Sequence, residues 1–271
     1  MSGNKLVVFI LALLITSNAA ALAADFWPPE GARAVALGGG IGSSNDAGAV
    51  FINPAGLAWQ TERQVITGLN NYSLLGLNSI YFGCVLPLTE NEGALGLGYS
   101  QLDAGTFAMV PFSEKNLNLA LARKLGNFAV AINLETAQQV VDTDLGQARS
   151  LDLAGSWRWG SLQGSVVWDN AFSWQKWQQA LSSPEPSSWQ VSAAWQHALG
   201  TINVTGTFQE ESWQYRYGFE RDLGSLSLRA GWNGAQPVFG AGFKKGMLQV
   251  DYACRNTDSG WMNMVTTLLK F

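Results

Sequence analysis

The chain has 271 residues, a formal net charge of −4 and a pI near 5.0. No block of Lys and Arg stands out, so the composition gives no support for nucleic-acid binding. Charged residues make up only 13% of the chain, about half the usual share of a soluble domain. This composition indicates a protein whose surface partly faces lipid.

The N-terminus has the pattern of an export signal. Lys5 precedes an apolar run at 6–15, and Ala21-Leu22-Ala23 forms a small-x-small cleavage pattern. We therefore expect a signal peptide over residues 1–23, with a retained membrane anchor as the alternative. No later window reaches the roughly 18 uninterrupted apolar residues of a spanning helix. If the exported chain enters a membrane, it must do so as strands.

Residues 24–62 form a second distinct region, rich in small side chains. Its two notable stretches are GARAVALGGG at 31–40 and NDAGAVFINPAGLA at 45–58. Asn53-Pro54 imposes an extended or turn conformation, and the Gly and Ala residues permit close approach to another surface. The alternative is a periplasmic linker, because small residues and Pro also mark linkers.

From Arg63 onward the sequence alternates with period two, which places one set of side chains on each face of a sheet. Alternation alone fits a soluble sandwich as well as a membrane barrel. The number of strands, about fourteen, and their length of roughly nine to eleven residues favour a transmembrane antiparallel β-barrel over 63–271. The candidate strands are 63–72, 77–88, 93–103, 114–123, 127–136, 150–158, 162–169, 188–197, 201–208, 213–220, 225–232, 237–243, 247–255 and 262–271.

The links between these strands differ in length. Alternate links are tight and often contain Gly, as at 124–126 and 244–246. The others include three that we expect to be long loops, at 104–113, 137–149 and 170–187. Short turns at one rim and longer loops at the other are typical of an outer-membrane barrel with a periplasmic N-terminus.

The last strand carries Val265, Thr267, Leu269 and Phe271 on one face. A terminal aromatic residue on an amphipathic strand resembles the insertion signal of bacterial outer-membrane barrels, so Phe271 is the expected insertion signal. The expected location is therefore the outer membrane of a Gram-negative-type envelope. The expected partners are outer-membrane lipid and the barrel-insertion machinery.

If the apolar faces meet lipid, the opposite faces line the lumen. The charges on that register nearly cancel, and because an isolated buried charge is costly they must be hydrated or paired. The lumen is then either a wet channel or a plugged one cross-linked by ion pairs. The inward polar residues are Glu135, Asp152, Arg158, Asp169, Arg216, Glu220, Arg229, Asp251 and Arg255.

The sequence offers little for catalysis. His197 is the only histidine and lies at a strand end, where we interpret it as a rim side chain. No His/Cys spacing suits a metal ion. We therefore expect no enzymatic activity, no metal site and no cofactor.

The two stretches of the 24–62 region carry a family resemblance. Gly31, Arg33, Ala36, Leu37, Gly38 and Gly39, followed by Asp46, Ala49 and 53–58, resemble the N-terminal signature of the FadL-like and PorV/PorQ outer-membrane proteins. The resemblance implies a 14-stranded barrel whose N-terminal segment folds into the lumen as a hatch. The expected hatch residues are Arg33, Leu37, Gly38, Gly39, Asp46, Asn53, Pro54, Ala55, Gly56 and Leu57.

Two functions follow from the resemblance. In FadL-like members hydrophobic compounds cross the outer membrane past such a hatch, whereas PorV and PorQ relatives assist a secretion system. The leading expectation is a passive channel for small apolar molecules, gated by the hatch. The alternative is a non-enzymatic component of a secretion or envelope assembly, with secretion-system proteins as partners. In both cases Arg33 and Asp46 are expected to pair with charges inside the barrel.

Overall fold

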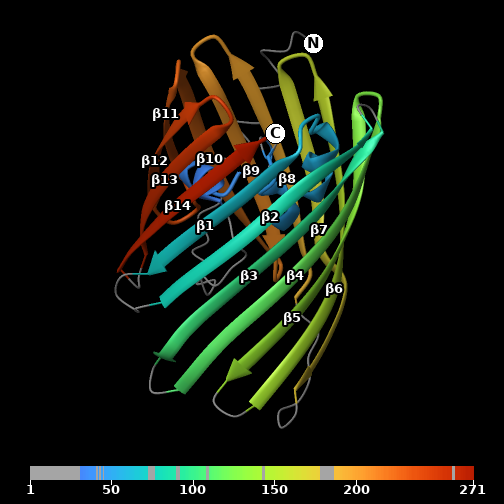
Figure 1. Ribbon diagram of the computed structural model, residues 1–271, viewed down its shortest axis with the longest axis vertical. Coiled ribbons are helices and arrows are strands. Elements are labelled where there is room, and N and C mark those ends of the chain that lie inside the picture. Colours follow the sequence, from blue (N-terminus) through green and yellow to red (C-terminus); the bar gives the residue numbers. More distant parts are fainter. Residues whose placement is uncertain are drawn as a thin grey trace.

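The computed structural model describes residues 31–40, 42, 44, 46–72, 77–89, 92–107, 110–141, 144–177, 186–257 and 260–271. Over these residues the chain forms a closed barrel of fourteen antiparallel strands, each paired with its neighbours in sequence, and β1 is paired with β14 (Figure 1). The prediction of a barrel of about fourteen strands is therefore confirmed.

The strands differ in length around the barrel. Their bounds are β1 Gln64–Tyr72, β2 Leu77–Thr89, β3 Gly93–Phe107, β4 Val110–Leu125, β5 Phe128–Val141, β6 Asp144–Trp159, β7 Leu162–Trp177, β8 Ser188–His197, β9 Gly200–Gln209, β10 Ser212–Leu223, β11 Leu226–Trp232, β12 Pro237–Lys245, β13 Leu248–Thr257 and β14 Gly260–Lys270. Strands β3 to β7 have 14–16 residues, whereas β8 to β14 have 7–12. The wall is therefore taller on the β3–β7 side (Figure 1).

Three short helical elements precede the strands. These are α2 Ala32–Ala36, α3 Ala49–Ile52 and the 3₁₀ helix η1 Pro54–Trp59. No helix among the described residues is long and apolar enough to cross a bilayer.

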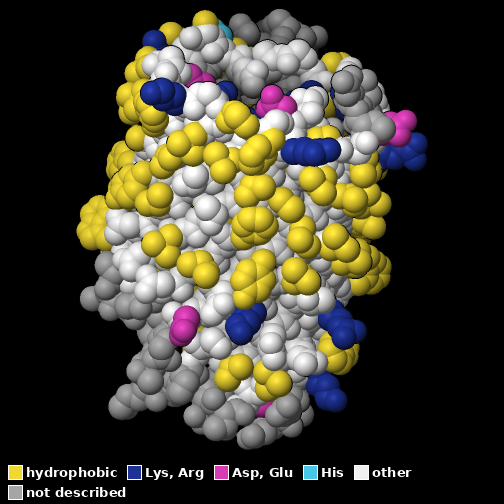
Figure 2. All heavy atoms as spheres, viewed as in Figure 1, with side chains coloured by type: hydrophobic (Ala, Val, Ile, Leu, Met, Phe, Trp, Pro, Cys, Tyr) yellow, Lys and Arg dark blue, Asp and Glu magenta, His cyan; other side chains and the backbone are white. Residues whose placement is uncertain are grey.

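Burial along the strands is the reverse of that in a soluble barrel. On β5 the apolar side chains of Val130, Ile132 and Leu134 are exposed, whereas Ala131 and Asn133 are buried. Because successive side chains point to opposite faces, the apolar set faces outward and the small and polar set faces the lumen. Figure 2 shows the outward set as a broad hydrophobic band across the face in view. This distribution excludes a sandwich with an apolar interior and matches a barrel with lipid outside.

The barrel closes beside the last residue of the chain. Strands β1 and β14 pair from Gln64↔Lys270 to Tyr72↔Met262. One further bond joins the Phe271 N–H to the Arg63 carbonyl at 2.9 Å. The Phe271 side chain is exposed, as an outward aromatic residue at the rim would be. Its role as an insertion signal stays a prediction.

The prediction of long loops at 104–113 and 137–149 is wrong. Strand β3 continues to Phe107 and β4 begins at Val110, while β5 continues to Val141 and β6 begins at Asp144. These strand ends carry polar residues on both faces, for example Gln138, which faces outward, and Gln139, which donates to Glu114 on the inward face. A hydrogen-bonded ladder needs no apolar face once it leaves lipid, so the loss of apolar alternation did not mark the end of the strands. Of the third expected loop, residues 170–177 belong to β7, and 178–185 lie outside the described residues.

Replacing Ile132 with Arg tests the lipid-facing surface. Ile132 lies in the middle of the exposed apolar stretch of β5. We expect Ile132→Arg to make folding into a bilayer less favourable by about 2–4 kcal/mol, because the guanidinium would enter hydrocarbon. Urea-dependent folding into phospholipid vesicles measures the effect. The control is Asn127→Arg, in the exposed turn before β5, which should change little. Equal losses from both substitutions would contradict a lipid-facing β5.

Candidate functional site

The described residues of 31–60 (31–40, 42, 44 and 46–60), called the inner segment below, lie against the inward face of the barrel. Element α2 contacts β11, β12, β13 and β14, whereas η1 contacts β3, β4, β5 and β6. The two ends of the inner segment therefore reach different parts of the wall, and Figure 1 shows these helices enclosed by the strands. The segment connects two parts of the wall that share no strand.

The turn after α2 approaches the wall backbone closely. A Cβ added to Gly218 would lie 2.4 Å from the Leu37 carbonyl oxygen, and one added to Gly240 would lie 2.5 Å from the Cβ of Ala36. Gly231 is similarly crowded, at 2.6 Å from the backbone nitrogen of Gly38. Gly218, Gly231 and Gly240 lie on β10, β11 and β12, so three adjacent strands offer a surface without side chains. Only such a surface admits the helix end at this distance.

Gly38 itself has a conformational reason to be glycine. Its φ is +77°, in the left-handed region, where other residues are strained. An added Cβ would also meet the Trp232 carbonyl oxygen at 2.5 Å. Both halves of this contact, the turn and the wall, therefore depend on glycine.

An ion-pair network joins the inner segment to the wall. Arg33 in α2 donates from Nε and Nη2 to the two carboxylate oxygens of Glu220, at 2.9 and 2.8 Å. Arg229 donates to Glu220 from Nε and to Asp251 from Nη1, the latter at 2.7 Å. Glu220, Arg229 and Asp251 are all buried, and Gln249 donates to the other oxygen of Asp251. A buried charge needs such partners, because an unpaired one is costly.

The charges of this network balance only when Arg33 is present. On the wall, the two carboxylates of Glu220 and Asp251 face a single guanidinium, that of Arg229. Arg33 supplies the second positive charge through a bidentate pair, the strong geometry for Arg and carboxylate. Burial alone would lower the pKa of Arg33, but the Glu220 carboxylate raises it above its ordinary value. The wall therefore presents an anionic site that is complementary to Arg33.

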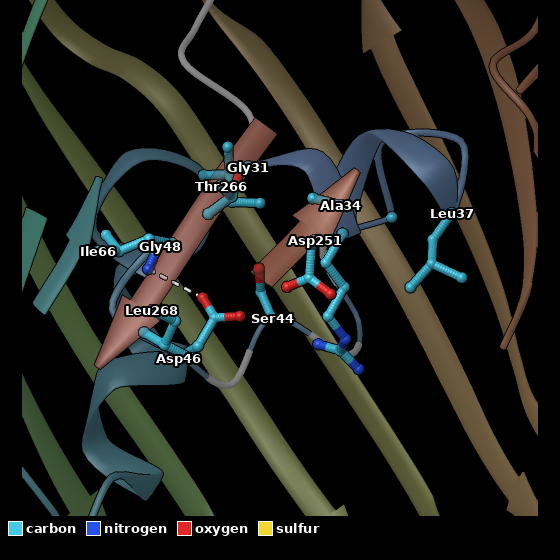
Figure 3. A pocket seen from close by; sticks show the side chains of 13 residues that line it. Gly31, Ala34, Leu37, Ser44, Asp46, Gly48, Ile66, Asp251, Thr266 and Leu268 are labelled. Carbon is cyan, nitrogen blue, oxygen red and sulfur yellow. Dashed lines mark hydrogen bonds between the residues drawn. The ribbon is translucent and has the colours of Figure 1, made fainter. Parts of the chain in front are cut away.

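A small cavity adjoins the network. It has a volume of about 20 Å³, room for about one water molecule, and Arg33, Ser44, Asp46 and Asp251 are among its lining residues. Figure 3 shows Ser44, Asp46 and Asp251 around it. Asp46 accepts a hydrogen bond from the Gly48 N–H at 2.9 Å. Burial raises the pKa of Asp46, against the opposing effects of Arg33 and the Gly48 N–H. The cavity is too small for a solute larger than water.

The second half of the inner segment packs through apolar and small residues. Val50, Ala55 and Leu57 are fully buried and belong to one core cluster with wall alanines such as Ala120 and Ala131. This contact needs small wall residues for the same reason as the glycine contact of α2. It contributes the apolar part of the attachment, which the ion pairs do not supply.

The Asn53-Pro54 step directs the chain from α3 into η1. Asn53 has an extended φ of −158°, and Pro54 begins the 3₁₀ helix, a position that its fixed φ favours. The Gly56 N–H donates to the Asn53 carbonyl at 2.8 Å. At the far end of η1, Trp59 donates to the Ser156 hydroxyl at 2.8 Å and lies under the Arg158 guanidinium at 4.7 Å.

Next to the wall alanines that contact η1, the inward face of β4 to β6 carries a polar ladder. Asn133 donates from Nδ2 to Asn118 at 2.9 Å and to Asp152 at 2.8 Å. Asp152 also accepts the Asn170 N–H at 2.8 Å. Asn118, Asn133 and Asp152 are buried on neighbouring strands β4, β5 and β6. One strand further on, Asp169 accepts from Ser188 and Gln190. This part of the lumen wall is therefore hydrophilic.

The structure places the predicted residues in several groups. Arg33, Glu220, Arg229 and Asp251 meet in the ion-pair network, with Asp46 beside it. Arg158 contacts Trp59, and Asp152 and Asp169 belong to the polar wall. Glu135, Arg216 and Arg255 occupy the inward register of β5, β10 and β13, away from the network. The remaining predicted residues of the inner segment are buried: Leu37, Gly38, Gly39, Asn53, Pro54, Ala55, Gly56 and Leu57.

Two inward contacts were not expected from the sequence. The hydroxyls of Tyr81 and Thr266 share a hydrogen bond of 2.6 Å. The Thr266 hydroxyl also accepts a hydrogen bond from the Ala32 N–H at 2.8 Å. Tyr81 lies over Gly68 of the adjacent strand, where an added Cβ would clash with its ring. An aromatic residue on the inward register opposite a glycine is the signal that could have identified this contact.

The structure adds no catalytic feature. His197 is exposed at the β8–β9 turn, where its Nδ1 accepts the Leu199 N–H. Among the described residues no group of three or more His, Cys, Asp or Glu could hold a metal ion. The expectation of no enzymatic activity stays a prediction.

Comparison with known proteins identifies structures of the same fold. The P. putida toluene transporter TodX aligns with a TM-score of 0.63 at 10% identity, over 89% of this chain and 98% of the TodX chain. The TodX deltaS2S3 mutant, a monoaromatic hydrocarbon channel, aligns with a TM-score of 0.56 at 11% identity, over 89% and 97%. No protein family model and no curated protein matches the chain. At this identity the likeness shows a shared barrel fold alone.

Gly218→Ala tests the close contact of α2. The added methyl group would overlap the Leu37 carbonyl, so we expect the attachment of the inner segment to weaken by about 1–3 kcal/mol. The readout is maleimide labelling of Ala32→Cys, a fully buried position, in a background with Cys84 and Cys254 replaced by Ser. The control is Gly155→Ala, where the nearest atom would lie 3.9 Å away. Equal labelling of the two variants would contradict the close contact.

Arg33→Gln tests the ion-pair network with the same labelling assay. The substitution removes both hydrogen bonds to Glu220 and leaves the wall with an excess negative charge. We expect a loss of about 1.5–3 kcal/mol in the attachment of the inner segment, seen as faster labelling of Ala32→Cys. Arg255→Gln is the control, because Arg255 lies on the inward register of β13 away from the network, where its Nε donates to the Met262 sulfur. Unchanged labelling in Arg33→Gln would show that the network does not anchor the segment.

Proposed function

We propose that the protein is an outer-membrane channel in which the inner segment acts as a hatch. The observation that carries the proposal is the attachment of the segment: one ion-pair network and one set of small-residue contacts hold it inside the barrel. An attachment of this kind can be released as a unit. The fold shared with TodX, described as a toluene transporter, supports a channel.

The ion-pair network is the expected point of release. A two-state hatch needs contacts that form in one state and are lost in the other. Arg33 meets Glu220 only when α2 is docked, whereas Arg229 and Asp251 remain together on the wall. Release of α2 therefore breaks this bidentate pair and the hydrogen bond from the Ala32 N–H to Thr266, and it withdraws the helix end from the wall glycines; release of the whole segment also separates the apolar contact of η1. It breaks no pairing between strands of the barrel.

Small apolar molecules are the first solute class that we propose. Support comes from the TodX structures, described as monoaromatic hydrocarbon channels, and from the resemblance of the 31–58 sequence to FadL-like proteins. The wall side chains Ile66 and Leu268, which line the small cavity, would be uncovered if the segment moved. An apolar solute would find contacts there.

The polar ladder favours a second solute class. Asn118, Asn133 and Asp152 present amide and carboxylate groups on the lumen side. Such a wall suits a small hydrophilic solute better than a hydrocarbon, because apolar solutes gain nothing from displacing its water. The two classes are separated by comparing uptake of an uncharged naphthalene dye with swelling of protein-containing vesicles in neutral sugars.

A role in a secretion or envelope assembly remains the alternative function, without an enzymatic step. It predicts that a native pull-down retains other envelope proteins in fixed ratio, and that opening the hatch has no effect on flux. The signal peptide, the outer-membrane location and insertion through Phe271 are part of both proposals.

A disulfide between the inner segment and the wall tests gating. A Cβ built on Gly40 lies 3.3 Å from the Asn203 Cβ, close to the separation of a disulfide. In a background with Cys84→Ser and Cys254→Ser, we expect oxidised Gly40→Cys/Asn203→Cys to show low conductance in planar bilayers. Reduction should restore it, and deletion of 31–58 should raise it further. Each single cysteine variant, treated with the same oxidant, is the control.

Two results would contradict a gating hatch. One is equal conductance of the oxidised and reduced double variant, with the cross-link verified by mass. The other is unchanged permeability after deletion of 31–58 while the barrel retains its heat-modifiable gel mobility. Either result, together with retained envelope proteins, would favour the assembly function.

A further inference from the structure

The hydrophobic band has a sharp lower edge on strands β4 to β7. The outward side chains of β5 are apolar at Ile132 and Leu134 and polar at the next two outward positions, Thr136 and Gln138. The edge lies away from Phe271 and near the hairpin tips of the tall part of the wall, because β4 begins at Val110. Figure 2 shows Lys and Arg side chains just beyond the band in this region. A lipid headgroup would lie at this edge.

The strand register arranges polar side chains in one row along the edge. Lys115 pairs with Gln138, Gln138 with Gln147, and Gln147 with Lys176. The four side chains are exposed and belong to adjacent strands β4, β5, β6 and β7. With strands roughly 4.8 Å apart, the two lysines lie on the order of 14 Å from one another. The row is therefore wide enough to contact a lipid headgroup.

The next row, on the lipid side, contains a hollow. There Leu117 pairs with Thr136, and Thr136 with Arg149. Thr136 is the smallest of the three, so it forms a floor between Leu117 and Arg149. The resulting groove has a volume of about 440 Å³. Arg149 lies over the ring of Trp174 at 6.0 Å, a cation–π contact that directs its guanidinium along the edge.

The charge around the groove is positive. Lys115, Arg149 and Lys176 contribute three cations on the outer surface, whereas the exposed acid Asp103 on β3 lies opposite Ser113, one row nearer the hairpin tips. The carboxylate of Glu114 lies on the inward register, where it accepts from Asn116 and Gln139. The outer face therefore favours an anion.

We propose that this groove, called the headgroup groove below, binds the phosphate of a membrane lipid. The acyl chains would lie on the hydrophobic band at Leu117 and Leu119, and the phosphate would meet Lys115, Arg149 and Lys176. Gln138 and Gln147 would donate to headgroup oxygens. The occupant is a phosphorylated lipid and not a soluble anion, because the groove opens directly onto the apolar band and Leu117 forms one of its walls. Basic side chains at a membrane edge attract anionic lipids in this way.

Native mass spectrometry of the full-length protein tests the proposal. The probes are dipalmitoyl phosphatidic acid and dipalmitoyl phosphatidylcholine, which share acyl chains and differ in headgroup charge. We expect Lys115→Gln/Arg149→Gln/Lys176→Gln to reduce the retained phosphatidic acid at least about tenfold, since each basic residue near the surface contributes to anionic-lipid binding. Retention of phosphatidylcholine should not change.

A matched control keeps the change in net charge. Arg123, Arg221 and Lys245 are exposed on three separate strands at the opposite rim, so Arg123→Gln/Arg221→Gln/Lys245→Gln removes the same charge without touching the headgroup groove. If the first triple variant does not fold, Thr136→Trp fills the floor of the groove and leaves the three cations, and it should also lose phosphatidic acid.

Three results would overturn the proposal. The groove variants could retain as much phosphatidic acid as the unmodified protein. The control could lose as much as the triple groove variant, which would indicate non-specific attraction. Glycerol phosphate at the same concentration could displace the lipid, which would indicate a site for a soluble anion. The conductance of the channel plays no part in this readout, so it is independent of the hatch.

Discussion

The bidentate pair between Arg33 and Glu220 is the contact on which the arrangement inside the barrel depends. Without Arg33 the wall holds two buried carboxylates, Glu220 and Asp251, against one guanidinium, Arg229. Because ionised groups are costly away from water unless paired, the wall stabilises a segment that brings one positive charge. The pair therefore has two states: it is formed when the segment is docked, and it is broken when the segment leaves the wall.

Small residues make that pair possible. The guanidinium of Arg33 reaches Glu220 only because α2 approaches the backbone of β10 to β12 over Gly218, Gly231 and Gly240. On the other side of the lumen, alanines of β4 and β5 play the same part for Leu57 and its neighbours. The exterior follows the opposite rule, with large apolar side chains where the strands meet lipid and polar rows where β3 to β7 rise beyond it. One alternating pattern thus supplies an attachment site inside and a lipid-facing surface outside.

Much of this could be predicted from the sequence, and the failures have a physical cause. Period-two alternation located all fourteen strands, and the same register placed Glu220, Arg229 and Asp251 on the lumen side. The sequence predicts loops at 104–113 and 137–149 because alternation of polarity ends there, although the hydrogen-bonded ladder continues. The choice of Glu220 as the partner of Arg33 could not be predicted. The two residues are 187 positions apart, and their meeting depends on how the closed barrel offsets its strands.

The central claim is that the inner segment is folded against the wall of the intact barrel. Hydrogen–deuterium exchange of the unmodified protein in a lipid bilayer tests it most directly. The amides of Asn53, Gly56 and Gln60 donate within the segment, so the account predicts that they exchange slowly, on the timescale of the barrel strands. Exchange of these amides at the rate of an unstructured peptide, while the strand amides remain protected, would contradict it.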